Sequence, residues 1–380
     1  MWGRCWRPEM ENGEGKLQIA DSSWMIWLDS EMNESEFLEG LISIPSPSGE
    51  EDAVAEYLLA QMAARGFQAH RDEAGNILGT LGPANAAREI VLLGHMDTVP
   101  GLIPVRWHGE QLYGRGAVDA KGPLAAFVLA AARVASRLHD ARLRVIGVVE
   151  EEAHGRGARH LAATMSPPEC VIIGEPSDWE GITLGYKGML TVDYRLTQPG
   201  GHSAGQHPGP AEAAVGFWNQ LMIYAEGCNR GRSGHFDTLD PALREFRTFG
   251  DGLDDGVDMN IVLRLPPGTD AEDLQKRMRT WCNGARLSFP SSDPPFRAEK
   301  NTPLVRALLR AIRAEGGRPC FKLKTGTSDM NVVGPAWGCP IVAYGPGNSS
   351  LDHTPYEHID LGEFRRAVSV LAQALETLVA

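Results

Sequence analysis

Four short apolar runs constrain the fold of this chain more than any other feature of its sequence. The runs EIVLL, RVIGVV, CVII and PIVAY cover residues 89–93, 144–149, 170–173 and 340–344. They do not alternate with polar residues, which is typical of strands buried on both faces of a mostly parallel sheet. Segments with helical periodicity lie at 33–44, 50–65, 122–138, 211–226, 270–281, 302–315 and 361–378. The expected fold class is therefore α/β.

The middle of the chain follows a different pattern. Residues 188–197 alternate like a half-exposed strand, and a helix and a strand near 243–249 follow. A strand at 257–265, the helix at 270–281 and a strand at 284–288 complete the order β-α-β-β-α-β, which is typical of a ferredoxin-like domain. We therefore expect a discontinuous α/β domain, residues 32–187 and 292–380, with a smaller α+β domain, residues 188–291, inserted.

The first 31 residues do not conform to the rest of the chain. They hold four of the nine tryptophans and show neither periodicity nor the apolar run of a signal peptide. The sequence MNESEFLEGL, which begins at Met32, indicates a capped amphipathic helix. We expect the natural start at Met32 and an N-terminal extension over 1–31; the alternative is a genuine appendage that binds a partner.

Composition excludes several classes of protein. With 49 acidic and 36 basic residues, the net charge is -13, which argues against a general nucleic-acid binder, since phosphate contacts need an excess of Lys and Arg. No apolar stretch reaches the roughly 18 residues of a membrane span. The six cysteines form no CxxC pair, so we expect reduced thiols in a cytoplasmic protein.

Residues with metal-binding side chains follow the apolar runs. His95 and Asp97 come after the first run, Glu150-Glu151-Glu152 after the second, Glu175 after the third, and His353 nine residues beyond the fourth. Asp119 stands in the Gly-rich stretch GRGAVDAKG, just before a helix. In open α/β sheets the functional crevice lies outside the carboxyl ends of the strands, so we expect these side chains to meet there.

Each of these residues alone has an ordinary alternative, as a turn, capping or solvated surface residue. Together they offer the mixed His and carboxylate set that suits a pair of Zn²⁺ or Co²⁺ ions. Two such metals activate a water and polarise a carbonyl, and a bridging carboxylate sets their spacing. A remaining acid can accept the proton of the water. GxSxG, P-loop, GxGxxG and HExxH motifs are absent from the sequence.

Several motifs resemble those of the M20 family of dinuclear-zinc amidohydrolases. They are GHMDTVP (94–100), GRGAVDAKG (114–122), EEEAHGRGA (150–158), GEPS (174–177), GGHSAG (200–205) and HTPYEHI (353–359). The resemblance spans residues 32–380 and implies a zinc-peptidase-like catalytic domain with a ferredoxin-like lid and dimerisation domain.

The resemblance also implies a role for each residue. His95 and Glu175 would bind one metal ion, Glu152 and His353 the second, and Asp119 would bridge both. Glu151 would be the general base, and Asp97 would orient His95, a role that the HxD spacing itself permits. The family has Asp-Glu-Glu where this chain has Glu150-Glu151-Glu152. A register slipped by one residue would make Glu150 the base instead.

Further residues are implied on the substrate side. His202 in GGHSAG would reach the active site of a neighbouring subunit and stabilise the oxyanion, which implies a homodimer. Substrate-binding candidates are Tyr186, Lys187, Arg264 and Lys324. A strand-end histidine and solvated or turn-forming residues are the alternatives at these positions.

Within the family, the strings GEPSDWEGITLGYKG and LDHTPYEHI most resemble the branch that serves lysine and arginine biosynthesis. Its members release lysine, or ornithine, from the C-terminal glutamate of LysW, a small acidic amino-group carrier protein. The expected function is that hydrolysis, with a LysW-like carrier as partner. Alternatives are a deacetylase of N-acetylornithine or a desuccinylase of succinyl-diaminopimelate and, more distantly, a non-catalytic metal-binding scaffold.

Overall fold

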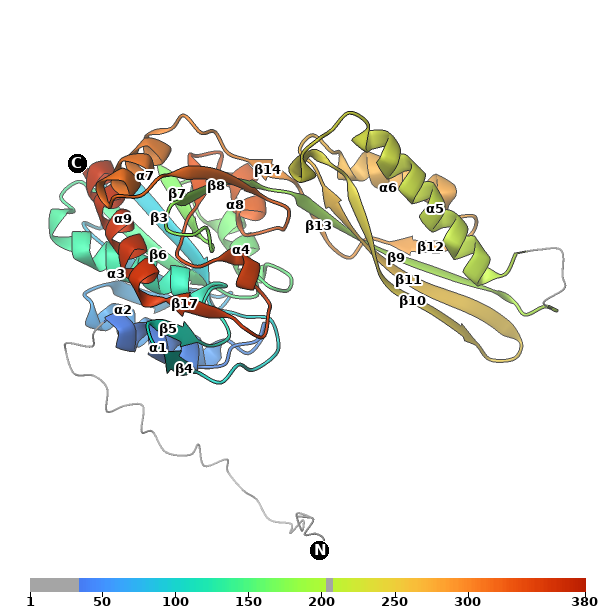
Figure 1. Ribbon diagram of the computed structural model, residues 1–380, viewed down its shortest axis with the longest axis horizontal. Helices are drawn as coiled ribbons and strands as arrows, with labels where there is room; N and C mark the ends of the chain where they lie inside the picture. The colour runs from blue at the N-terminus through green and yellow to red at the C-terminus, as the bar shows by residue number, and fades with distance from the viewer. Residues whose placement is uncertain (1–33, 203–207) are drawn as a thin grey trace, which may run out of the picture.

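The computed structural model describes residues 34–202 and 208–380. The prediction that residues 1–31 are an extension and that the natural start is Met32 lies outside the described residues. The described chain forms two parts that lie side by side, a larger α/β domain and an elongated lid domain (Figure 1).

The four predicted buried strands are neighbours in the central sheet. They are β6 (Ala141–Val148), β3 (Arg88–His95), β7 (Cys170–Gly174) and β16 (Ile341–Ala343), and they run parallel in that order. At one side the sheet continues with β2 (Ile77–Leu81) and β1 (Gln68–Arg71). At the other side it continues with β8 (Gly181–Tyr186), β14 (Phe296–Arg297) and β15 (Cys320–Lys324). The mostly parallel α/β sheet is as predicted.

Successive residues of these strands pack into different cores. In β3, Ile90 and Leu92 belong to the core on one face, whereas Val91 and Leu93 belong to the core on the other. The first face is covered by α1 (Glu34–Ser43), α2 (Asp52–Ala64), α3 (Lys121–Val134), α7 (Pro303–Ala314) and α9 (Leu361–Val379). The second is covered by α4 (Arg156–Thr164) and α8 (Met330–Trp337). Burial on both faces explains why these strands carry no polar alternation.

A small antiparallel sheet lies beside α1 and holds the ends of two loops. It consists of β4 (Arg106–His108), β5 (Gln111–Tyr113) and β17 (His358–Asp360) (Figure 1). The 3₁₀ segments are Ala135–Arg137, His235–Asp237 and Ser349–Leu351. Because β5 and β17 flank the loops that carry Asp119 and His353, their pairing ties those loops together.

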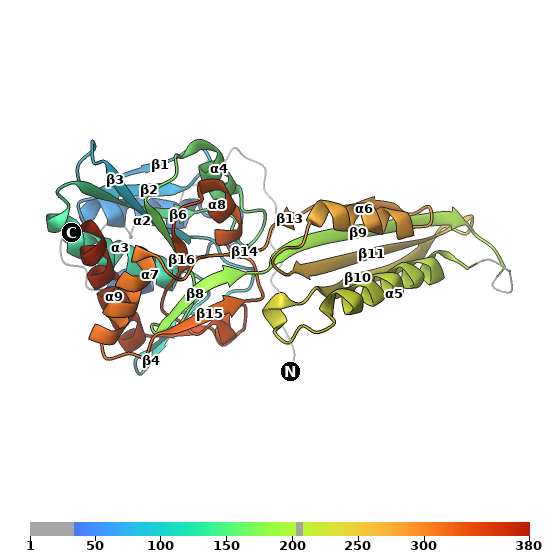
Figure 2. The same ribbon diagram turned by 90° about the horizontal axis from the view of Figure 1, so that it is seen from above.

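The lid has the predicted β-α-β-β-α-β order. Its elements are β9 (Gly188–Pro199), α5 (Pro210–Asn229), β10 (Asp240–Gly250), β11 (Asp254–Leu265), α6 (Ala271–Trp281) and β12 (Arg286–Ser288), with β13 (Ser292–Asp293) added beside β9. The sheet order β10-β11-β9-β12 is that of a ferredoxin-like domain. Both helices pack on one face of this sheet (Figure 2), so its other face is open.

Two crossings connect the domains. The first falls at Lys187, between β8 and β9, and the second runs from Asp293 to Phe296, between β13 and β14. They lie beside the predicted domain boundaries. Among the described residues, no helix is long and apolar enough to cross a membrane.

Candidate metal centre and active site

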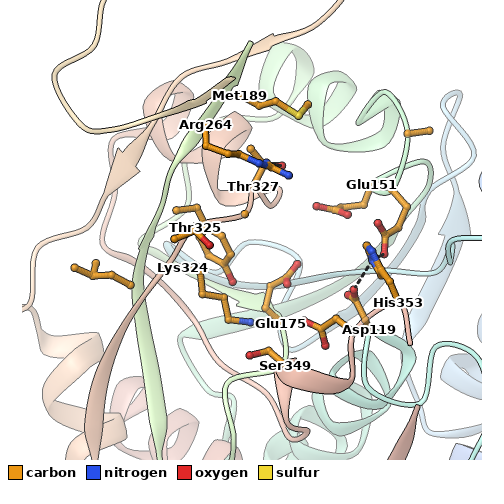
Figure 3. Close-up of a pocket in the computed structure, with 16 residues that line it drawn as sticks. Asp119, Glu151, Glu175, Met189, Arg264, Lys324, Thr325, Thr327, Ser349 and His353 are labelled. Atoms are coloured by element: carbon orange, nitrogen blue, oxygen red, sulfur yellow. Dashed lines mark hydrogen bonds and ion pairs between the residues drawn. The ribbon is translucent and has the colours of Figure 1, made fainter. Parts of the chain in front are cut away.

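The strand ends bring the predicted side chains to one place. β3 ends at His95, β6 leads into Glu150–Glu152, and β7 leads into Glu175. Because these strands run parallel, their carboxyl ends meet at the same edge of the sheet. A cavity of about 570 Å³ opens there, and its lining includes Asp119, Glu151, Glu152, Glu175 and His353 (Figure 3).

Asp119 lies between two histidines. Its Oδ1 is 3.2 Å from Nε2 of His95, and its Oδ2 is 3.1 Å from Nε2 of His353. His353 Nε2 also lies 2.8 Å from Oε1 of Glu152. One carboxylate that presents a different oxygen to each of two histidines has the geometry of a bridging ligand.

The potential ligand atoms form two overlapping groups. Those of His95, Glu151 and Glu152 lie within 4.8 Å of one another, and so do those of Asp119, Glu152 and His353. Glu175 belongs to neither group, although it lines the same cavity and is buried. The predicted ligands therefore surround one cavity, with Glu175 somewhat apart.

Asp97 holds both His95 and the glutamate loop. Its Oδ1 lies 3.5 Å from His95 Nδ1 and accepts a hydrogen bond of 3.0 Å from the backbone N–H of Glu151. Its Oδ2 accepts from the N–H of Glu152 at 3.0 Å and from Ser48 Oγ at 2.7 Å. His95 Nδ1 lies 2.9 Å from the backbone oxygen of Asp97 itself. A fully buried carboxylate with these contacts fixes the ring of His95 and the position of the two glutamates at once.

Negative charge is crowded in the cavity. Burial raises the pKa of Glu151 and of Glu175 well above the ordinary value, and neighbouring carboxylates add to the effect. Burial likewise raises the pKa of Glu152. Such groups resist ionisation unless positive charge is supplied, which is what a pair of divalent cations provides.

The same crowded carboxylates favour the charged form of the two histidines. Hydrogen bonds to Asp119 and Glu152 raise the pKa of His353 to about 10. Burial disfavours the charged form of His95, but the carboxylates of Asp119 and Asp97 outweigh it and raise its pKa. Burial also disfavours ionised Asp119, yet the two histidines hold its pKa far below its usual range. The donor set, with its surplus of buried acid, fits divalent metal ions.

Glu357 supports Asp119 and was not predicted from the sequence. Its Oε1 accepts hydrogen bonds from the backbone N–H groups of Val118, at 3.0 Å, and Asp119, at 3.1 Å. Its Oε2 accepts from Arg115 Nη1 at 2.8 Å. Glu357 is completely buried. Its place in the motif HTPYEHI, four residues after His353, was the signal that could have identified it.

The substrate-side candidates divide into two groups. Tyr186, Arg264 and Lys324 line the cavity, with Arg264 across from the carboxylates (Figure 3). Lys187 does not line it: its fully buried Nζ donates to the backbone oxygens of His235, at 3.0 Å, and Thr238, and to Asp240 Oδ2. In this structure Lys187 joins the first crossing to the start of β10.

Glu150 and His202 lie away from the cavity lining. The carboxylate of Glu150 pairs with Arg156 Nε at 2.8 Å, so the alternative register, with Glu150 as the base, finds no support in its position. His202 follows the end of β9, which is at the far end of the lid (Figure 1). It lines a separate cavity beside Pro199 and Phe249.

Comparison with known proteins gives a consistent family match. The model of peptidase family M20/M25/M40 matches residues 91–377. A protein of Deinococcus radiodurans named LysW-lysine hydrolase is 45% identical over 352 residues, which cover 90% of this chain and 96% of that relative. A protein of Pyrococcus furiosus named putative LysW-lysine/LysW-ornithine hydrolase is 40% identical, covering 90% of this chain and 95% of that relative.

Solved structures share the fold at low sequence identity. The M20-family metallo-carboxypeptidase Sso-CP2 of Sulfolobus solfataricus matches with a TM-score of 0.76 at 18% identity, covering 92% of this chain and all of that chain. A dinuclear metal-binding peptidase of the M20 family from Bacillus subtilis matches with a TM-score of 0.68 at 12% identity, covering 91% of this chain and 97% of that chain.

Proposed function

This chain belongs to peptidase family M20/M25/M40 and is a metal-dependent amidohydrolase, and we propose that it releases lysine, or ornithine, from the C-terminal glutamate of a LysW-like carrier protein. The choice of substrate rests on the relatives named above. The reaction would serve lysine or arginine biosynthesis, which is expected to place the protein in the cytoplasm.

The observation that carries the hydrolytic function is the position of Asp119. Its two oxygens face His95 and His353, with Glu151 in the same cavity. Amide hydrolysis at a pair of metals needs such a bridging carboxylate and one further acid to handle protons.

We assign the ligands accordingly. His95 and Glu175 would hold one ion, Glu152 and His353 the other, and Asp119 both; the mixed nitrogen and oxygen set favours Zn²⁺ or Co²⁺. When bound, such a pair lowers the pKa of a water and polarises the amide carbonyl. The crowded carboxylates and the shared position of Asp119 support this assignment.

The chain's own residues would then move protons and hold the substrate. Glu151 accepts the proton of the attacking water and passes it to the leaving amine. Arg264 bears no carboxylate partner among the described residues, and its Nη1 lies 3.4 Å from Thr327 Oγ1. With Lys324 on the same cavity, it suits a substrate carboxylate. Burial raises the pKa of Tyr186 well above its usual value, so its hydroxyl remains a donor.

A homodimer would complete the site. His202 follows a strand that points away from the cavity of its own subunit, so it would act on a neighbouring copy. The edge strand β10 exposes Leu243 and Phe246, and the adjacent α5 exposes Val215 and Ile223. An exposed edge strand with apolar side chains is a surface on which a second copy could pair.

An activity panel tests the proposal. Purified, zinc-loaded protein is offered the carrier with lysine on its C-terminal glutamate, the same conjugate with ornithine, N-acetylornithine and N-succinyl-diaminopimelate. We expect the highest kcat/KM on a carrier conjugate. Turnover of N-acetylornithine or of N-succinyl-diaminopimelate, with none on either conjugate, would assign the chain to a sister activity, and no turnover of any amide would indicate a non-catalytic scaffold.

A further inference from the structure

The open face of the lid sheet continues directly from the active-site cavity. Met189 of β9 and Arg264 of β11 are cross-strand partners, and both line that cavity. Side chains of alternate residues along a strand lie on the same face, so Thr191, Asp193 and Arg195 follow Met189. The residues between them, such as Leu190 and Val192, pack under the two lid helices.

A second cavity lies further along this open face. It has a volume of about 320 Å³ and is lined by Asp193, Arg195 and Asp258, among others. Arg195 is six residues beyond Met189 along β9, which is about 20 Å at about 3.3 Å per residue. A free acylated amino acid fills only the active-site cavity, so only a substrate with a polypeptide attached reaches this far.

One row of cross-strand partners at the second cavity has an unusual charge. Arg286, Arg195, Asp258 and Arg247 stand opposite one another on β12, β9, β11 and β10; we call these four residues the arginine row. The row holds three guanidinium groups and one carboxylate, and two of the three pair with that carboxylate. Asp258 accepts from Arg247 at 2.8 Å and pairs with Arg195 at 3.2 Å.

Arg286 is left without compensation. It is exposed, makes no ion pair within residues 34–202 and 208–380, and stands opposite the like charge of Arg195. Like charges directly opposite each other destabilise a sheet. The adjacent row adds two acids: Asp193 accepts a hydrogen bond from the neutral amide of Asn260 at 2.7 Å, and Glu245 lies 3.7 Å from Arg247, and neither pairs with Arg286. Among the arginines of the row, Arg286 therefore remains available to an anionic group from outside this chain.

We propose that the arginine row docks an acidic polypeptide, the segment of the carrier that precedes its C-terminal glutamate. The inference rests on the proposed function. An extended peptide spans about 20 Å with roughly six residues, so the glutamate lies in the active-site cavity while acidic side chains about six residues earlier meet Arg286 and Arg195. In a chain with a net charge of -13, an Arg286 that is unpaired within the described residues, beside the like charge of Arg195, gives an acidic side chain of a partner a place to bind.

The experiment compares two substrates that contain the same amide. One is the carrier protein conjugated to lysine, and the other is the dipeptide γ-glutamyl-lysine. In Arg286→Glu we expect kcat/KM for the carrier to fall about tenfold, mainly through KM, as for one lost charge-assisted contact. The value for the dipeptide should change less than about twofold, because Arg286 lies beyond its reach.

One control variant and two further measurements make the result specific. Arg310→Glu introduces the same charge change on the exposed side of α7 and should leave both substrates unaffected. The melting temperature of Arg286→Glu should be unchanged or higher, because the variant replaces a like-charge pair with an opposite-charge pair. Added salt should lower kcat/KM for the carrier more steeply in the wild type than in the variant.

Each outcome decides a different point. A carrier conjugate that is hydrolysed equally well by wild type and Arg286→Glu overturns the docking surface and leaves the proposed function intact. Equal losses on both substrates also overturn it, since they indicate a general defect of the lid. If the wild type does not hydrolyse the carrier at all, the proposed function fails and the docking proposal fails with it.

Discussion

Glu151 is the residue from which the chemistry can be tested most directly. Glu151→Gln keeps the shape of the side chain but cannot accept a proton, so we expect kcat to fall by about 10²-fold or more, with two metal ions still bound per subunit. Steady-state kinetics and metal analysis measure both. Glu150→Gln is the matched control, because Glu150 pairs with Arg156 outside the cavity. The reverse pattern, with Glu150→Gln inactive, would move the base by one position.

Glu363 makes stability depend on pH. Its Oε1 accepts hydrogen bonds from the backbone N–H groups of Trp179, at 3.1 Å, and Gly347, at 3.0 Å, but burial outweighs them and raises its pKa. A carboxyl whose pKa is higher in the folded state stabilises fully below its unfolded pKa, and this stabilisation is lost as pH rises through the folded pKa.

Glu363→Gln keeps an oxygen that can accept both hydrogen bonds and never ionises. We therefore expect the free energy of unfolding of the variant, relative to the wild type, to increase as pH rises from about 4 towards 7. Urea denaturation across that range measures the difference. A constant difference at all pH values would mean that ionisation of Glu363 does not contribute.

For single residues, the sequence predicts the position of side chains that follow buried strands. It does not predict contacts between residues that are far apart in the sequence. His95 and Glu175 were identifiable because parallel strands bring their carboxyl ends together. Lys187 was expected to hold substrate, yet its ammonium group meets Asp240, 53 positions away. Such a pairing depends on the path of the lid strands, which no local pattern contains.

Among the elements, α8 contacts both domain crossings through one side chain. Asn331 donates from Nδ2 to the backbone oxygens of Lys187, at 3.1 Å, and Pro294, at 2.8 Å, which lie on different crossings. Its Oδ1 accepts from the N–H of Ser328 at 2.9 Å, next to Thr327 of the cavity lining. The buried amide thus joins both crossings to the substrate side of the cavity.

Asn331→Asp is expected to destabilise the protein by about 2 kcal/mol or more, because two buried carbonyls lose their donor. If Asn331 acts by holding the lid strand that carries Arg264 over the cavity, Asn331→Asp should lower kcat/KM less in a variant that already carries Arg264→Ala. A double-mutant cycle measures this coupling, and strictly additive losses would reduce Asn331 to a stability role. Asn301→Asp, at an exposed asparagine bonded to Arg306, is the control.

Long or strongly patterned elements were predictable from the sequence, and short irregular ones were not. The periodicity at 361–378 corresponds to α9, in which Phe364, Val368 and Leu371 face the core. α4 begins at Arg156 after a left-handed glycine, and α8 contains Pro335. Both are short and carry residues that ordinarily break helices. Packing on the sheet, in the core that includes Leu161 and Trp337, stabilises them instead.

For the whole molecule, metal removal should affect activity and stability together. Exhaustive chelation should abolish hydrolysis and lower the melting temperature, because it leaves the crowded carboxylates of Glu151, Glu152 and Glu175 without compensating charge. Zn²⁺ or Co²⁺ should restore both properties, as followed by calorimetry and turnover. Turnover that persists in metal-free protein would contradict the mechanism.

The insertion of the lid also sets the order in which the centre is assembled during synthesis. Glu152 and His353 meet across 201 positions of sequence, and the whole lid is translated between them. The lid is continuous in the chain and has its own core, so it can fold while the other domain still lacks β16 and α9. Until β16 and His353 have emerged from the ribosome, the nascent enzyme has neither the complete central sheet nor the full set of proposed metal ligands.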